Sequence, residues 1–392
     1  MMATSPYVTH RLEAFGSTIF AQMSELAAAT GSLNLGQGFP DYDGPPEIFV
    51  GAQEAMAAGF NQYCHGAGVL ELRQAIAEHQ DRFYGLHIDP EEEVLVTTGA
   101  TEAIAAVLLG ILNAGDEVIA FEPFYDSYAA CISLADAQLV PVTLRGASWD
   151  FDPEELRAAF GPRTRALLLN TPHNPTGKIF SLDELQLIAE LAADHDCLVI
   201  ADEVYEHLCF DAQHVPISSL PAMAERTLTI SSGGKTFSCT GWKVGWVTGP
   251  AQLVSAARSA KQFLSYVNSS PLQYGIAAGL RLGDEYFRGL AADLAAKRAV
   301  LADGFRAIGI EPFWPASGYF MSIDVGPLGF ADGMEFCQHI AHTAQLVAIP
   351  SQVFYQDPTR GLQYVRWAFC KRDVVLAEAC ERLLALAAVA QS

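Results

Sequence analysis

Apolar residues along the chain follow two kinds of pattern. In segments 11–30, 69–84 and 181–194 they recur at the spacing of an amphipathic helix, and Ser181 with Glu184 forms a capping box at the start of the last segment. Short continuous apolar runs, typical of buried strands, lie between the helical segments. The predicted strands are 94–98, 116–121, 165–169, 197–201, 227–230 and 243–247. Strands that alternate with helices predict an α/β fold, with a mainly parallel central sheet covered by helices on both faces.

The pattern changes after about residue 290. The elements predicted there are an Ala-rich helix over 290–307, strands near 319–324 and 364–369, and helices over 332–343 and 373–389. A few short strands among helices are typical of a smaller α+β domain. We therefore predict an N-terminal arm (1–40) that joins the smaller domain, a large domain (41–289) and a small C-terminal domain (290–392).

Polar and small residues gather just after the predicted strands. These segments are 99–101, 123–125, 170–174, 202–205 and 232–235. Ligands of open α/β sheets bind at the carboxyl ends of the parallel strands, so the five segments predict one site along a single edge. At 99–101 a turn of small residues leads directly into a helix predicted over 101–112, and the backbone dipoles of such a helix start favour an anion.

The segment from Ile230 to Trp246 carries the strongest candidate for chemistry. Its Lys235 follows two glycines, which allow a bulky ligand to come close to the backbone. A lysine amine forms a Schiff base with a carbonyl cofactor when burial or nearby cations suppress its charge. Lys243 could supply that cation or hold a phosphate. A Gly/Ser turn with two surface lysines is the alternative interpretation of this segment alone.

Composition narrows the possible partners. The formal charge of −22 argues against nucleic acid as a partner, because a phosphate backbone needs a basic face. No uninterrupted apolar run is long enough to span a bilayer, and the segment from Met1 to Gly16 lacks the apolar core of a signal peptide. We therefore expect neither a membrane nor a nucleic acid as a partner.

The cysteines and histidines indicate neither disulfides nor a metal site. Eight cysteines are scattered without a Cys-x-x-Cys motif, which is typical of reduced thiols and predicts a cytoplasmic protein. His339 and His342 lie three residues apart on a predicted helix, but no third ligand is nearby. No metal is predicted.

Taken together, these motifs resemble those of the fold-type I aminotransferases of class I/II, which use pyridoxal 5'-phosphate. The matching segments are Asn34–Asp41, Thr98–Glu102, Asn170–Gly177, Asp202–Tyr205, Ser232–Lys235 and Arg366. They stand in the family's order and cover nearly the whole chain. The chain is most similar to the kynurenine, glutamine and methionine aminotransferases. Segments 122–128 and 369–372 also resemble N-succinyldiaminopimelate aminotransferases of actinobacteria.

The resemblance implies how the cofactor would be held. Lys235 would bind its carbonyl and then act as the acid and base, and Asp202 would keep its ring nitrogen protonated. Tyr205 and Asn174 would hydrogen-bond the 3-oxygen of the ring, and Tyr125 would stack on the ring. The residues expected around the phosphate are Ala100, Thr101, Ser232 and Lys243, together with Tyr63 donated by the second subunit of a homodimer.

The resemblance also implies a clamp for the substrate. Arg366, with Asn170 and the Gly36 N–H, would hold the α-carboxylate. Arg366 lies inside an otherwise apolar strand, and a buried arginine needs an anionic partner.

The segments expected around the substrate side chain are 15–40, 62–68 and 265–271, and none of them contains Lys or Arg. A tryptophan common in the family near Thr18, and an aromatic residue or histidine near Asn268, are absent. We therefore expect a neutral donor such as methionine, phenylalanine, glutamine or kynurenine to be preferred over aspartate. The same argument counts against N-succinyldiaminopimelate, whose distal end is charged, unless an arginine of the partner subunit neutralises it.

Three rival functions follow from the same residues. A β-C–S lyase with this site would release pyruvate and ammonia from a cysteine conjugate without any 2-oxo acid. A regulator on this fold would need a DNA-binding module, but the residues before Asn34 carry no basic patch. A nicotinamide oxidoreductase would need a glycine fingerprint, and Gly66-Ala67-Gly68 is not followed by the third glycine. The expected function is that of an aminotransferase.

Overall fold

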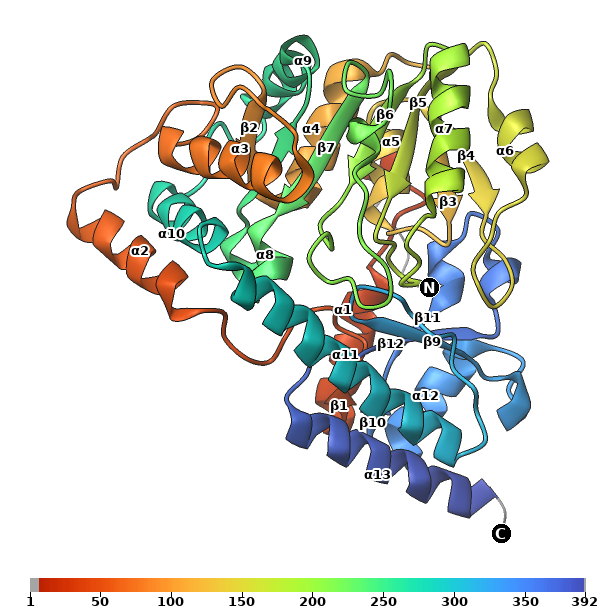
Figure 1. The fold of residues 1–392 in the computed structure, drawn as a ribbon. Coiled ribbons are helices and arrows are strands. Elements are labelled where there is room, and N and C mark those ends of the chain that lie inside the picture. Colours follow the sequence, from red (N-terminus) through yellow and green to blue (C-terminus); the bar gives the residue numbers. More distant parts are fainter. Residues whose placement is uncertain (1–6, 391–392) are drawn as a thin grey trace.

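A seven-stranded sheet forms the centre of the larger part of the molecule (Figure 1). The computed structural model describes the backbone of residues 7–390 and the side chains of residues 7–385. In spatial order the strands are β2 (Val94–Thr97), β8 (Gly245–Thr248), β7 (Thr227–Ser232), β6 (Leu198–Asp202), β5 (Thr164–Asn170), β3 (Glu117–Glu122) and β4 (Gln138–Thr143). The predicted α/β class with a mainly parallel sheet is confirmed.

One strand departs from the parallel pattern. The pairs from β7 to β4 are parallel, whereas β8 is antiparallel to both β7 and β2. Only the four-residue helix α8 (Gly233–Thr236) and the short 3-10 turn η3 (Thr240–Trp242) lie between β7 and β8. Without a helix long enough to cross the sheet, the chain returns beside the strand that it has just left. The strand predicted at 243–247 accordingly begins at Gly245.

Helices cover both faces of this sheet. On one face lie α4 (Gly99–Ile111), α5 (Ser127–Leu134) and α9 (Ala251–Lys261), and on the other lie α6 (Pro153–Ala159) and α7 (Leu182–Asp194). Consecutive strand residues alternate between the two faces: Leu168 packs with the first group of helices and Leu167 with the second. The sequences of these strands are continuous apolar runs because both faces of the sheet are buried.

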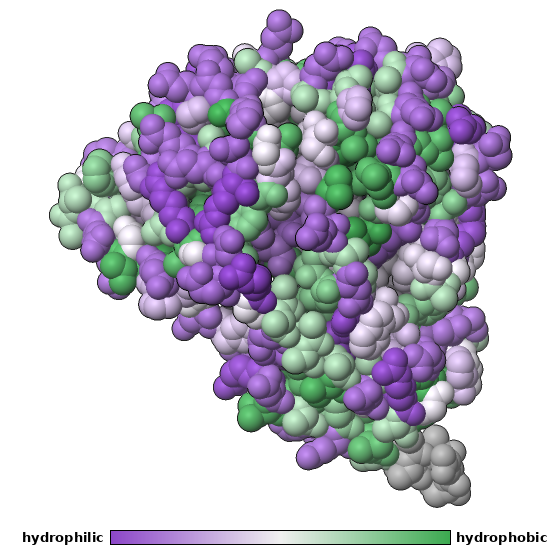
Figure 2. All heavy atoms as spheres, in the orientation of Figure 1, coloured by the Kyte–Doolittle hydropathy of each residue, from purple (hydrophilic) through white to green (hydrophobic). Residues whose placement is uncertain are grey.

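A third group of helices packs beside β2 and β8. These helices are α2 (Pro46–Ala57), α3 (Leu70–Tyr84) and α10 (Ser270–Leu280), and they share a core with Val96 and Trp246 of the two strands. Among the described residues, no helix combines the length and the apolar character needed to cross a bilayer. Figure 2 shows hydrophilic residues over much of the visible face, with patches of hydrophobic residues between them.

The C-terminal part contains a second, smaller sheet. Its strands are β11 (Ile349–Pro350), β12 (Tyr364–Ala368) and β9 (Phe320–Asp324), and both of its pairings are antiparallel. The helices around it are α1 (Ile19–Thr30), α11 (Asp284–Ala307), α12 (Gly333–Thr343) and α13 (Asp373–Ala390). A further pair, β1 (Leu33–Asn34) with β10 (Leu346–Val347), attaches the N-terminal segment to this part.

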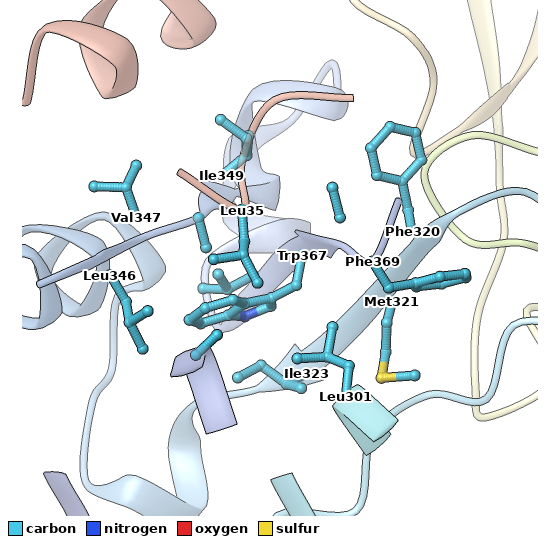
Figure 3. Close-up of a cluster of buried hydrophobic side chains, with 14 of the residues drawn as sticks. Leu35, Leu301, Phe320, Met321, Ile323, Leu346, Val347, Ile349, Trp367 and Phe369 are labelled. Atoms are coloured by element: carbon cyan, nitrogen blue, oxygen red, sulfur yellow. The ribbon is translucent and has the colours of Figure 1, made fainter. Parts of the chain in front are cut away.

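The core of the C-terminal part is built around Trp367 (Figure 3). This indole is fully buried and lies among aliphatic side chains that include Leu35, Ile323 and Leu301. Residues from both ends of the chain therefore share one core. The domain limits stay a prediction: α11 runs unbroken across residues 289 and 290, and residues 1–6 lie outside the described residues.

Several predicted boundaries are wrong. The helix expected from residue 11 begins at Ile19, because the Thr18 side chain accepts the Ala21 N–H as an N-cap, and only a single 3-10 turn, His10–Leu12, precedes it. The helix expected from residue 290 begins at Asp284. The edge strand β4 had not been predicted, and it contains a proline at position 141, which a strand tolerates at the edge of a sheet.

We expect the Leu301→Ala substitution to lower the free energy of unfolding by about 2–5 kcal/mol, because it removes a fully buried side chain from the Trp367 core. Val300→Ala is the matched control on the same helix, since Val300 is 45% exposed, and its effect should stay within about 0.5 kcal/mol. Chemical denaturation of both variants measures the difference. Equal losses would show that this core does not carry the stability of the fold.

Candidate active site

A cavity of about 350 Å³ lies where the carboxyl ends of β3, β5, β6 and β7 face the small sheet. The structure brings all five predicted strand-end segments to this cavity. The predicted site residues that line it are Ala100, Thr101, Tyr125, Asn170, Asn174, Asp202, Tyr205, Ser232, Lys235, Lys243 and Arg366. Parallel strands place their polar carboxyl ends along one edge, and that is why segments far apart in the sequence meet here.

Lys235 enters the cavity from α8, directly after the end of β7. Its Nζ donates a hydrogen bond of 2.8 Å to Tyr319 Oη and a longer one of 3.4 Å to the Gly38 carbonyl. Burial lowers the pKa of the Lys235 amine to about 8. A substantial fraction of the amine is therefore neutral near pH 8, which is the form that attacks a carbonyl.

An anion cradle lies at the N-terminus of α4. Gly99 has a φ of 72°, and a side chain there would meet Lys243 Nζ at 3.2 Å. Gly245 packs still more closely, since an added Cβ would lie 2.6 Å from the Gly99 carbonyl carbon. Free helix N–H groups, a lysine ammonium and the Ser232 hydroxyl at the end of β7 together suit a phosphate.

Asp202 at the end of β6 offers a buried carboxylate. Its Oδ2 accepts a hydrogen bond of 2.6 Å from Tyr128 Oη, and its Oδ1 accepts only a long one of 3.4 Å from the Val204 N–H. Burial raises the pKa of Asp202 to about 6, and the Tyr128 hydrogen bond opposes that rise. The carboxylate can thus accept a further donor, as a protonated ring nitrogen would be. Tyr128 was not predicted as a site residue, because nothing in its aromatic segment shows which ring faces Asp202.

Arg366 carries a positive charge into the interior. It is 1% exposed, and its guanidinium stacks over the Phe320 ring at 3.9 Å. Its Nη1 donates to Asn174 Oδ1 and its Nη2 to the Gly36 carbonyl, both at 3.0 Å. Among the described residues, no carboxylate forms an ion pair with it, and burial lowers its pKa to about 10. A bound carboxylate would supply the missing anion.

The substrate clamp differs in two respects from the predicted one. Arg366 pairs with Asn174, whereas Asn170 Nδ2 donates to the carbonyls of Pro172 and Asp202 and braces the loop. The Gly36 N–H, predicted to bind the substrate, donates instead to the side-chain oxygen of Asn34 at 2.9 Å. The Gly36–Asn34 and Asn170–Pro172 hydrogen bonds are local turn contacts, and the bond from Asn170 to the Asp202 carbonyl joins the ends of two neighbouring strands.

Tyr63 lies apart from the other predicted residues. Its side chain is 83% exposed, and its ring packs edge-on against Tyr266 at 5.7 Å rather than lining the cavity of its own chain. Tyr319 and Phe320, by contrast, reach the site without having been predicted. Both lie where β9 begins, far in sequence from the strand ends, and the pairing of the small sheet brings them there.

Behind the cavity lies a buried cluster of metal-ligand type. Within the described part of the chain, His79, Glu206 and His207 could approach a common ion. His79 and His207 already hydrogen-bond each other through their Nε2 atoms at 2.6 Å, and Glu206 accepts the hydroxyl hydrogens of Tyr84 and Ser231. These hydrogen bonds already engage all three residues, and His79 Nδ1 is a buried atom without a hydrogen-bond partner.

Residues 30–383 match the family model for aminotransferases of class I and II. The chain belongs to this family. Members of the family use pyridoxal 5'-phosphate, and the site of this aminotransferase fits that cofactor: the α4 cradle suits its phosphate, the Asp202 carboxylate suits its ring nitrogen, and Lys235 suits its carbonyl.

Three known proteins show how close the similarity is. The aminotransferase is 48% identical over 389 residues to the probable N-succinyldiaminopimelate aminotransferase DapC of Mycobacterium tuberculosis, covering 96% of this chain and 98% of that protein. It is 37% identical over 385 residues to methionine aminotransferase of Escherichia coli, covering 97% and 99%. The solved structure of N-succinyldiaminopimelate aminotransferase from Mycobacterium tuberculosis matches with a TM-score of 0.94 at 47% identity, covering 97% of this chain and all of that one (100%).

We expect Lys235→Ala to lose both the visible absorbance of the bound cofactor and the turnover, because no other lysine of this segment points its amine at the same place. Borohydride reduction of the wild-type protein, followed by peptide mapping, should label Lys235. Lys243→Ala is the control: it should still be labelled at Lys235 but bind cofactor more weakly, since it loses only a cation of the cradle. A label on a different lysine would disprove the assignment.

Proposed function

We propose that the amino donor of this aminotransferase carries no charged group in its side chain close to the α-carbon. The single observation that carries the proposal is the set of cations at the cavity. Among the described residues that line it, these are Lys235, Lys243 and Arg366. Lys235 is assigned to the cofactor carbonyl and Lys243 to the phosphate, so Arg366 alone remains for a substrate carboxylate.

The remaining walls are suited to an uncharged side chain. Phe20 and Phe320 both lie close to the Arg366 guanidinium, with their ring centroids 5.2 and 3.9 Å from its central carbon, and Val204 adds an aliphatic surface. The second carboxylate of aspartate, one methylene from the α-carbon, would be buried there without a cation. Leaving a charge unpaired in such a place costs several kcal/mol. Methionine and phenylalanine carry no such charge.

The residues of the chain divide the work of the reaction. When bound, pyridoxal 5'-phosphate supplies the carbonyl that takes the substrate amine and the ring that accepts the electrons of the broken Cα–H bond. Arg366 and Asn174 orient the substrate through its α-carboxylate. Lys235 would carry the proton that leaves Cα, as the acid and base of the reaction. Asp202 would keep the ring nitrogen protonated, and Tyr205 would hydrogen-bond the ring oxygen.

N-succinyldiaminopimelate is the second candidate donor, and the 48% identity to DapC favours it. Its reacting carbon is followed by methylene groups, and the charges of its side chain lie at the far end of the molecule. A distal charge that reaches the mouth of the cavity stays in water, so it needs no buried cation. The charge argument made from sequence therefore excludes short dicarboxylates more strongly than this long one.

The catalytic efficiency kcat/KM for methionine, phenylalanine, aspartate and N-succinyldiaminopimelate, measured with one common acceptor, tests the proposal. We expect aspartate to be the poorest donor by at least about tenfold, the ratio that 1.4 kcal/mol produces. Arg366→Gln is the control: it should lower the efficiency of every donor and preserve their order, because the α-carboxylate is common to all. Aspartate as the best donor would refute the pocket argument.

We further propose a cytoplasmic homodimer whose active sites are shared between subunits. Tyr63, Phe263 and Tyr266 expose 83%, 85% and 47% of their surface, and such neighbouring apolar side chains are typical of an interface. Tyr63 cannot serve its own cavity from this position, so a partner subunit would have to bring it to the phosphate. The cytoplasmic location rests on eight cysteines that are all free thiols.

Mixing two inactive variants, Tyr63→Ala and Lys235→Ala, tests the shared site. Half of the re-formed dimers would be hybrids, each with one intact site, so activity should recover to about one quarter of the wild-type value. The control is a mixture in which every subunit carries Lys235→Ala. No activity should be recovered in this mixture. A mixture of the two different variants that stays inactive after subunit exchange, or a monomer by light scattering, would contradict the proposal.

A further inference from the structure

Tyr319 lies directly beside Lys235, although it belongs to the opposite side of the cavity. It precedes β9, and its side chain is 1% exposed. Lys235 Nζ donates a hydrogen bond of 2.8 Å to Tyr319 Oη. Tyr319 Oη in turn donates one of 2.6 Å to the Gly38 carbonyl. One hydroxyl group thus joins the lysine amine to the N-terminal segment.

The far end of this link is held rigidly. Side chains of the C-terminal part bond four successive carbonyls of the segment 36–39. Arg366 bonds the first carbonyl, and Lys371 bonds those on either side of Gly38, at 3.3 and 2.8 Å. Tyr319 bonds the remaining carbonyl, that of Gly38. The acceptor of the phenol hydrogen is therefore held in place, and Oη accepts the hydrogen bond from the Lys235 amine.

The Tyr319 ring is held as firmly as its hydroxyl. It packs at a right angle on Tyr205, with ring centroids 5.3 Å apart, and edge-on against Phe320 at 4.8 Å. The amine of Lys235 lies 5.4 Å from the centroid of the Tyr319 ring. A change of the Tyr319 χ1 angle, which would swing the whole ring away, would break these contacts together with both hydrogen bonds.

We propose that Tyr319 is a positioning residue for Lys235, whose hydroxyl holds the amine in place and stabilises its protonated form. Tyr319 thereby sets the pH at which the lysine becomes able to attack a carbonyl and to accept a proton. The proposal rests on the aminotransferase activity and not on the identity of the amino donor. A different donor would leave it intact.

The electrostatic surroundings give the direction of the effect. Burial lowers the pKa of Lys235, and Tyr319 Oη is its short hydrogen-bond acceptor among the described residues. The charged or titratable groups that act on the amine are Cys370 and Asp202, which favour the ammonium, and Arg366 and Lys243, which oppose it. Burial and the two cations destabilise the ammonium form of Lys235, and the Tyr319 hydroxyl stabilises it. Without this hydroxyl the pKa of Lys235 should therefore fall.

Competitive labelling of the apoenzyme measures this directly. A trace amount of isotope-labelled acetic anhydride is added between pH 6 and 10, and the Lys235 peptide is quantified by mass spectrometry. In the wild-type protein half-maximal labelling should occur near pH 8, the value about which the amine titrates. In Tyr319→Phe the half-point should fall by about one pH unit, the effect of losing one hydrogen bond to a charged group.

Tyr286→Phe is the matched control. Its hydroxyl donates a hydrogen bond of 2.7 Å to the carbonyl of Thr236, next to Lys235 in the chain, without touching the amine. Its half-point should equal that of the wild-type protein. An unchanged half-point in Tyr319→Phe, or an equal shift in the control, would overturn the proposal.

A second variant covers the case in which Tyr319→Phe does not fold. Tyr319→Met also lacks the hydroxyl, and a flexible methionine fills an irregular apolar space. Its half-point should fall in the same direction, and a value equal to that of the wild-type protein would overturn the proposal. Since the apoenzyme is measured without any amino donor, failure here is distinct from failure of the proposed donor class.

Discussion

A positive charge buried without an anion organises this molecule. Arg366 is 1% exposed and, in the described part of the chain, has hydrogen-bond acceptors but no carboxylate partner. Such a charge is expensive, and an amide oxygen and a backbone carbonyl compensate for it only in part. The unpaired guanidinium therefore favours the binding of an anion in the cavity. An amino acid and a 2-oxo acid carry the same α-carboxylate, so the proposed role of Arg366 would apply to both halves of a transamination.

The strand that carries this charge also explains how the fold tolerates it. Neighbouring residues of β12 point to opposite faces, so Arg366 faces the cavity while Trp367 anchors the core of the C-terminal part. Leu35, from the N-terminal segment, belongs to the same core, and its carbonyl accepts the Ala368 N–H. The burial of apolar side chains on one face of β12 thus holds Arg366 in place on the other face, although burying its charge is costly.

Burial also adjusts the two groups expected to act on the cofactor. It raises the pKa of Asp202 to about 6 and lowers that of Lys235 to about 8, so each group is brought closer to neutrality than it would be in water. The hydroxyls of Tyr128 and Tyr319 work against this by stabilising the charged forms. Two phenols, neither of them predicted as a site residue, thus oppose the effect of burial on these pKa values.

The sequence alone was sufficient for six of the seven strands of the central sheet and for most of the cavity wall. Apolar runs predicted the strands because both faces of the sheet are buried, and the Ser181–Glu184 capping box marked the start of α7 as observed. Polar residues that follow parallel strands must meet at one edge. Local order in the chain was therefore enough to bring Lys235, Asp202 and Asn174 to one place.

Only the tertiary structure decided which of these groups touch. The antiparallel course of β8, the pairing of Arg366 with Asn174 and not Asn170, and the contact of Tyr319 with Lys235 all join residues that no local pattern relates. Each depends on how whole elements pack, because a side chain's partner is set by distances of a few ångströms between parts of the chain that are far apart in sequence. The sequence by itself thus determined the kinds of chemical group at the site, and the packing of the small sheet against the large one determined their hydrogen bonds and their charges.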